Sequence, residues 1–197
     1  MREFADEFGF TVGAQNFAVP IKNGAMTGEI NDEMLKELGV KTVLVGHSER
    51  RVYFGETDEI VSIKVQRALG NAITPIICVG ETLKDRETGK TKMVLQTQIF
   101  AALSRLDENL KKQVIFAYEP VWAIGTGVVA SIEQIQETHT FIRSIVGQVP
   151  LLYGGSVNDV NCAEITATPN VNGVLVGGAS IDVDKFATII NTAGGGA

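Results

Sequence analysis

The stretch that decides the fold is residues 114–127, which read VIFAYEPVWAIGTG. An apolar run ends at Glu119, a proline follows directly, and two glycines near the end of the segment allow close backbone approach to a ligand. A lid that carries a catalytic base at its hinge requires this combination. An ordinary strand-to-helix connection with an exposed glutamate fits the same residues about as well, so the interpretation depends on the rest of the chain.

Short apolar runs of the same form recur along the chain, beginning near residues 11, 42, 74, 114, 151 and 174. Each ends in glycine or a polar residue, and helical segments lie between most of them. This alternation indicates parallel strands joined by right-handed crossovers, and the continuous apolar runs indicate strands buried on both faces. The sequence therefore predicts an α/β fold without an internal domain boundary. An open doubly wound sheet fits the pattern almost as well as a barrel.

The clearest helix follows residue 131, where Ser131 and Gln134 have the spacing of a capping box. Gly147 marks its end. Its apolar stripe has helical spacing and consists of Ile132, Ile135, His139, Ile142 and Val146. The position of His139 on this stripe predicts a structural histidine, hydrogen-bonded in the core.

Composition excludes several classes of protein. The chain has 17 basic and 23 acidic residues, a formal charge of -6 and no Lys/Arg run, so a nucleic-acid partner is not expected. No apolar stretch reaches the roughly 18–20 residues of a membrane span, and the N-terminus lacks the apolar centre of a signal peptide. Cys78 and Cys162 have neither metal-ligand spacing nor a disulfide framework. We expect a cytoplasmic protein without a metal or cofactor.

A histidine follows the second apolar run, in the sequence VGHSERR at residues 45–51. A helix that begins after His47 would direct its positive end at the ring, which disfavours the imidazolium form. A neutral imidazole can donate a hydrogen bond to a carbonyl oxygen. The alternative is a structural histidine held in the core.

Two glycine-rich turns follow the last two apolar runs, YGGS at 153–156 and GVLVGGAS at 173–180. Backbone amides in such turns, with a short helix after Gly178, can cradle a phosphate group. Ordinary turns are the alternative. Ser156 belongs to no recognisable Ser-His-Asp arrangement with a nucleophile elbow.

Together with GAQN at 13–16, TGEI at 27–30 and CVGETLKDRETGKT at 78–91, these segments closely resemble the triosephosphate isomerase family. The resemblance runs from about residue 1 to about residue 190, in one order and with matching spacing. It implies a single incomplete (β/α) barrel domain over residues 1–193, with six of the eight parallel strands, and a Gly-rich tail at 194–197.

The resemblance also implies roles for particular residues. Glu119 would be the base that moves a proton between the carbons beside the substrate carbonyl. His47 would polarise that carbonyl in its neutral form, which is the pattern established for this enzyme, and Glu49 would be a helper carboxylate. The substrate phosphate would be bound by Gly125, Ser156, Gly177 and Gly178. The closing lid would comprise Pro120, Val121, Trp122, Ala123, Ile124, Gly125, Thr126 and Gly127.

The family's first strand, first helix and second strand have no counterpart here, and with them the Asn-x-Lys motif that supplies a catalytic lysine. We therefore expect little or no isomerase activity from this chain by itself. One alternative is a non-catalytic oligomer that binds phosphate or sulfate, and another is one part of a split enzyme. A barrel isomerase with a different substrate is a remote possibility. The exposed edges predict a homo-oligomer with a rearranged interface, because the family's usual contact loop, Phe17 to Ile30, would lose its socket.

Overall fold

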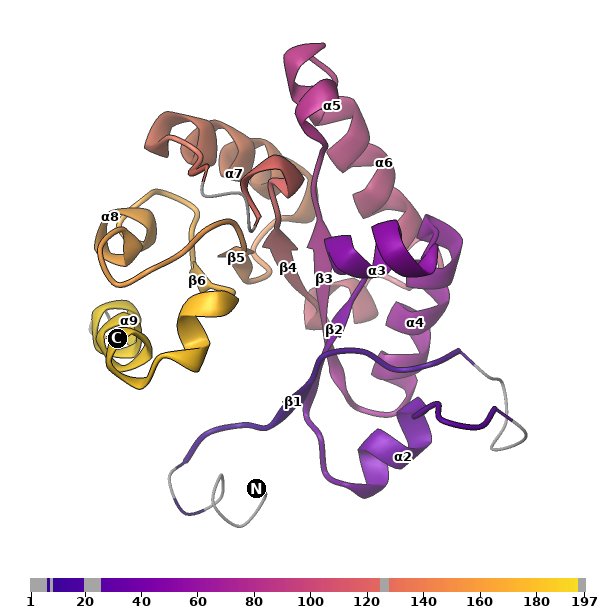
Figure 1. Cartoon of the computed structure of the whole chain (residues 1–197). Coiled ribbons are helices and arrows are strands. Elements are labelled where there is room, and N and C mark those ends of the chain that lie inside the picture. Colours follow the sequence, from indigo (N-terminus) through magenta and orange to yellow (C-terminus); the bar gives the residue numbers. More distant parts are fainter. Residues whose placement is uncertain (1–6, 8, 20–25, 125–127, 195–197) are drawn as a thin grey trace. The chain divides into compact units, whose positions relative to one another are not determined.

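The computed structural model of the chain describes residue 7 and residues 9–19, 26–124 and 128–194. It divides into two compact units, unit 1 with Met1–Cys78 and Phe100–Ile115, and unit 2 with Val79–Ile99 and Phe116–Ala197. Each unit is considered by itself below, and its elements can be followed in Figure 1.

The first half of the described chain contains β1 (Gly13–Ala14), α2 (Asp32–Glu37), β2 (Thr42–Val45), α3 (Ser48–Phe54), α4 (Asp58–Gly70), β3 (Thr74–Val79), α5 (Leu83–Glu87) and α6 (Thr91–Leu103). The second half contains the 3-10 helix η1 (Leu110–Gln113), β4 (Ile115–Tyr118), η2 (Val121–Ala123), α7 (Ile132–Val146), β5 (Leu151–Tyr153), α8 (Cys162–Thr166), β6 (Gly173–Val174), η3 (Gly178–Ile181) and α9 (Val183–Gly194).

Unit 1 is built on three parallel strands in chain order. Gly13 of β1 lies opposite Thr42 of β2, and Thr42 in turn lies opposite Thr74 of β3. Helix α4 packs on β2 and is capped by Thr57, whose hydroxyl accepts from the amide of Ile60. The buried apolar core of the unit includes Val43, Val45, Val61, Val65, Ala68 and Ile77.

Gly46 ends β2 at a position that only glycine fits. Its φ angle is 73°, in the left-handed region that side chains disfavour. A Cβ atom there would also lie 2.8 Å from Cγ2 of Val61 and 3.1 Å from a guanidinium nitrogen of Arg51. The glycine therefore lets the chain turn sharply out of β2, directly before His47.

Unit 2 repeats the arrangement with β4, β5 and β6, which are again parallel and in chain order. Tyr118 of β4 lies opposite Tyr153 of β5, and Tyr153 lies opposite Val174 of β6. Helix α8 packs against α7, α9 and β6. The buried side chains of the unit include Phe116, Ala117, Leu151, Cys162 and Ile165.

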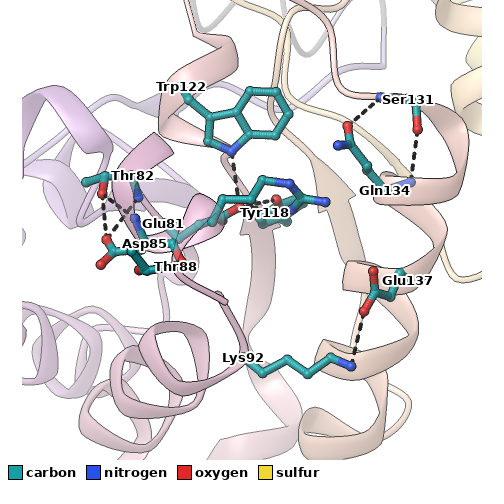
Figure 2. A network of polar contacts seen from close by, with 11 residues as sticks. Glu81, Thr82, Asp85, Thr88, Lys92, Tyr118, Trp122, Ser131, Gln134 and Glu137 are labelled. Carbon is teal, nitrogen blue, oxygen red and sulfur yellow. Dashed lines mark hydrogen bonds and ion pairs between the residues drawn. The ribbon is translucent and has the colours of Figure 1, made fainter. Parts of the chain in front are cut away.

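Helix α7 has the capping box that its sequence predicts. The Ser131 hydroxyl accepts from the Gln134 amide, and the Gln134 side chain accepts from the Ser131 amide, as Figure 2 shows. The buried residues of the helix are Ile135, Thr138, His139 and Ile142. Ile132 and Val146, at the two ends of the predicted stripe, are only half-buried.

The predicted fold class is confirmed. Six parallel strands occur in the described residues, and each begins within two residues of its predicted start. Within each unit the parallel strands follow the order of the chain. Within the described ranges, no helix is long and apolar enough to cross a membrane.

Candidate active site

Glu119 directly follows β4 and is only 2 % exposed. Its amide donates to the carbonyl oxygen of Val79 over 2.8 Å, and the carbonyl of the preceding Tyr118 accepts from the amide of Gly154 at the same distance. The backbone on both sides of the carboxylate is therefore fixed. A buried, positioned carboxylate of this kind is not the exposed glutamate of an ordinary connection.

Two glycines enclose Glu119. A Cβ atom on Gly80 would lie 1.7 Å from the carbonyl oxygen of Glu119, and one on Gly154 would lie 3.0 Å from its Cγ. Gly155 is equally constrained, since a Cβ there would lie 2.2 Å from the Tyr153 hydroxyl oxygen. Gly80 and Gly154 follow different strands, and a larger residue at either position would collide with Glu119.

The first half of the predicted lid, residues 120–124, is attached to Glu81. The amide of Val121 donates to the Glu81 carbonyl over 3.2 Å, and Nε1 of Trp122 donates to its Oε1 over 3.1 Å. The Tyr118 hydroxyl and a guanidinium nitrogen of Arg86 donate to the same oxygen, at 3.1 and 3.2 Å. Figure 2 shows how Trp122 and Tyr118 converge on Glu81. This fully buried carboxylate therefore ties residues 121 and 122 to β4.

Tyr118 is well suited to donate in this network. Burial, reinforced by the negative charge of Glu81, raises the pKa of its hydroxyl group. The hydroxyl keeps its proton across the physiological pH range and remains a donor to Glu81. The carboxylate consequently accepts from a neutral phenol, an indole and a guanidinium.

The second contact of the lid hinge is with Ser156, whose hydroxyl donates to the carbonyl of Ala123 in η2. Gly177 and Gly178 follow β6 at the start of η3, where the amide and hydroxyl of Ser180 both donate to the Gly177 carbonyl. Among the hydrogen bonds of the described residues, none uses the amide of Gly177 or Gly178 as a donor. These two N–H groups are therefore available to donate to an anion.

His47 and Glu49 lie in unit 1, at the N-terminus of α3. His47 is the N-cap of the helix, and its Nδ1 accepts from the amide of Glu49 over 3.3 Å. The Glu49 carboxylate is exposed and lies 4.0 Å from Nδ1.

His139 is placed as a structural histidine. It is completely buried, its Nδ1 lies 3.1 Å from the carbonyl oxygen of Asn170, and the rings of Tyr118 and Tyr153 lie about 6 Å away. Because a carbonyl only accepts, Nδ1 carries the proton. Burial lowers the pKa of His139 to about 4.

The structure thus places Glu119, the hinge residues 120–124, Ser156, Gly177 and Gly178 in unit 2, and His47 and Glu49 in unit 1. Gly125, Thr126 and Gly127 lie outside the described residues. Sequence reasoning did not find the role of Glu81. It follows Gly80 at the end of a strand, as Glu119 follows β4, but it also directly precedes the Thr82–Asp85 capping box of α5. Among described side chains, no group of three His, Cys, Asp or Glu could hold a metal ion.

Fold and site define an α/β chain of the (β/α)-barrel type, with a buried carboxylate, a loop anchored on a second buried carboxylate and glycine turns at the C-terminal ends of parallel strands. The sequence model for triosephosphate isomerase matches residues 1–193. The triosephosphate isomerase of Francisella tularensis subsp. mediasiatica is 48% identical over 190 residues, which cover 92% of this chain and 75% of the relative. That of Ruthia magnifica is 49% identical over 186 residues, covering 90% and 75%. The chain belongs to the triosephosphate isomerase family, and by family it is an isomerase.

Proposed function

We propose that the site interconverts dihydroxyacetone phosphate and glyceraldehyde 3-phosphate, the glycolytic and gluconeogenic reaction of the family, with Glu119 as the base. The observation that carries this assignment is the position of Glu119, which is buried, fixed by backbone hydrogen bonds and followed directly by the hinged segment. Removing a proton beside a carbonyl requires a positioned base from which water is excluded. Glu119 would take the proton from one carbon and return it to the next.

The remaining roles in this proposal are those that the family implies. His47, as a neutral imidazole, would polarise the substrate carbonyl, with Glu49 as a helper carboxylate. The amides of Gly177 and Gly178 and the turn at Ser156 would bind the substrate phosphate, together with Gly125. Trp122, held by Glu81, would fix the hinge about which the lid closes.

The test is the turnover of dihydroxyacetone phosphate by the purified chain at high protein concentration, compared with a Glu119→Gln variant. Glutamine keeps the shape of the side chain but cannot take up the proton. We expect the variant to lose about 10²–10⁴-fold of whatever rate the unaltered chain shows, which is the usual contribution of a general base. Equal rates for the two proteins would contradict the assignment of Glu119.

A polypeptide of these 197 residues carries no Asn-x-Lys motif ahead of Gly13. Loss of one preorganised donor for a developing negative charge costs about 10²–10³-fold in rate. We therefore expect its turnover to fall below that of the full-length relatives by at least this factor. A rate within tenfold of the relatives would refute this part of the proposal.

Binding of phosphate or sulfate at the turn after β6 is a separate part of the proposal, because the amides of Gly177 and Gly178 do not depend on catalysis. Phosphate binding would therefore also occur if the chain were a non-catalytic oligomer that only binds phosphate. Calorimetry with millimolar phosphate should detect weak binding, and a complete absence of heat would count against it.

We also propose that the chain forms a homo-oligomer whose interface differs from the usual one in the family. Apolar side chains that are exposed in each unit support this: Val52, Tyr53 and Phe54 on α3, and Val160, Ile181 and Val183 around α8 and α9. Light scattering behind a sizing column tests it, and a single species near 21 kDa would refute it.

We propose a cytoplasmic location as well. The buried free thiols of Cys78 and Cys162 support it, because disulfides are rare in the cytosol.

A further inference from the structure

Unit 2 contains a pocket of about 340 Å³ that none of the proposed catalytic or phosphate-binding residues lines. It lies between the end of α5, the start of α6 and the middle of α7. Its volume is within the range of small-molecule sites. The side chains that matter for its chemistry are Arg86, Thr91, Lys92, Glu137 and Phe141.

The charge pair at the edge of this pocket is easily opened. Lys92 and Glu137 form the ion pair drawn in Figure 2. Its Nζ–Oε1 distance is 3.1 Å, and both side chains are about 60 % exposed. Pairs this exposed contribute only about 0.2–1 kcal/mol. An incoming anion can therefore take the place of the Glu137 carboxylate beside Lys92.

Arg86 supplies the second cation of the pocket. Its guanidinium has five N–H donors, and the hydrogen bonds of the described residues use one of them, to Oε1 of Glu81. The group also lies 5.3 Å from the ring centroid of Trp122, in a cation–π contact. Arg86 thus has donors to spare for a ligand and also contacts the hinge of the lid.

We propose that this pocket binds a small oxyanion, the phosphate or carboxylate group of a small molecule, between Arg86 and Lys92. Glu81 stays buried beside Arg86, whereas the exposed Glu137 carboxylate beside Lys92 can be displaced, so a negative ligand can take its place, and planar oxyanions suit the remaining donors of the guanidinium fork. Because Arg86 touches both Glu81 and Trp122, occupancy of the pocket changes the surroundings of Trp122. The site goes beyond the isomerase function proposed above and does not rest on it.

Trp122 is the only tryptophan of the chain, so its fluorescence reports on the pocket directly. The probe is inorganic phosphate, titrated into the full chain at constant ionic strength, with acetate and chloride in parallel. We expect a saturable change with phosphate and none with chloride. A similar change with acetate would indicate a general oxyanion site, whereas no response to acetate would indicate a site for phosphoryl groups.

Two substitutions at the pocket have opposite expected effects. Lys92→Met removes a binding cation and should weaken the apparent affinity about tenfold. Glu137→Gln removes the competing carboxylate and should tighten binding about 2- to 5-fold, the equivalent of the small energy of the exposed pair. Circular dichroism would verify that each variant folds.

Matched controls separate this pocket from general charge effects. Lys84→Met and Glu164→Gln make the same charge changes at exposed positions outside the pocket. Both should leave the fluorescence titration within about twofold of the unaltered chain. A signal that arose at the turn after β6 would respond to neither Lys92→Met nor Glu137→Gln. A missing saturable signal, equal effects of Lys92→Met and Lys84→Met, or equal effects of Glu137→Gln and Glu164→Gln would each overturn the proposal.

Discussion

Glu119 in unit 2 and His47 in unit 1 both follow the end of a parallel strand, but the chain holds them in different ways. Glu119 is 2 % exposed, and residues from several strand ends enclose it. The side chain of His47 is 24 % exposed, and the amide of Glu49, in the helix that His47 caps, donates to its ring. Tertiary packing therefore encloses the carboxylate, whereas the imidazole is partly exposed at the start of a helix.

This difference predicts how well each site tolerates amino-acid substitutions. A side chain enclosed by backbone atoms cannot shift to compensate for a shorter or larger neighbour. A side chain at an open helix terminus can adjust. Substitutions at and around Glu119 should therefore have larger effects than equivalent ones near His47.

The largest effect is expected from shortening the two carboxylates by one methylene group. Glu119→Asp withdraws the carboxylate proposed as the base by about one methylene length, and the enclosing backbone cannot follow, so turnover should fall about 10²-fold. Glu49→Asp, at the exposed carboxylate beside His47, should change turnover less than threefold. Steady-state rates at high protein concentration measure both. Similar losses of turnover in the two variants would contradict the difference between the enclosed and the exposed carboxylate.

The enclosure itself is tested by Gly80→Ala. The new methyl group would lie 1.7 Å from the carbonyl oxygen of Glu119, a backbone atom that cannot rotate away. We expect a loss of about 3 kcal/mol or more in the free energy of unfolding, the upper end for overpacked sites. Gly194→Ala in α9, where a Cβ would meet nothing within 4 Å, is the control and should change stability little. Urea denaturation of both variants that gave equal midpoints would contradict the close approach.

The burial of His139 can be tested by varying the pH. Burial lowers the pKa of His139 from 6.5 to about 4. Between these values the unfolded chain binds more protons than the folded one, so stability falls as the pH falls from about 6.5 to about 4, by at most about 3 kcal/mol. His139→Gln keeps a donor for the Asn170 carbonyl but removes the titration. Its denaturation midpoints should depend less on pH in this window than those of the unaltered chain, and identical pH profiles would refute the assignment.

The smallest effect is expected at the hinge contact of Ser156. Ser156→Ala removes the hydrogen bond to the Ala123 carbonyl and should cost about 0.5–1.5 kcal/mol of unfolding free energy. Ser144→Ala on α7 removes an exposed hydroxyl that bonds its own helix, and we expect a smaller loss there. Thermal denaturation compares the two. A loss at Ser144 as large as that at Ser156 would mean that the hinge contact adds no particular stability.

The sequence predicts the local features of this molecule well. Strand starts follow from continuous apolar runs, and the first turn of α7 follows from Ser131 and Gln134, because each depends on residues close in the chain. The position of His47 at the start of α3 has the same local origin. Glu119 at the end of β4 is predicted for the same reason.

The enclosure of Glu119 and the function of Glu81 could not be predicted in this way. Gly80 and Gly154 lie 39 and 35 positions from Glu119, and only strand pairing reveals that they touch it. Glu81 precedes a strong capping signal for α5, which accounts for an acidic residue there without any further function. Its contacts with Tyr118 and Trp122 depend on tertiary packing alone.

The measurement that tests the central claim most directly is deuterium incorporation into dihydroxyacetone phosphate in heavy water, followed by NMR at high protein concentration over hours. It detects proton removal by the base even where net turnover is slow. Glu119 as the base predicts incorporation above the protein-free blank with the unaltered chain, and incorporation at the level of the blank with Glu119→Gln. Equal incorporation by both proteins, above the blank, would show that another group removes the proton and would contradict this account.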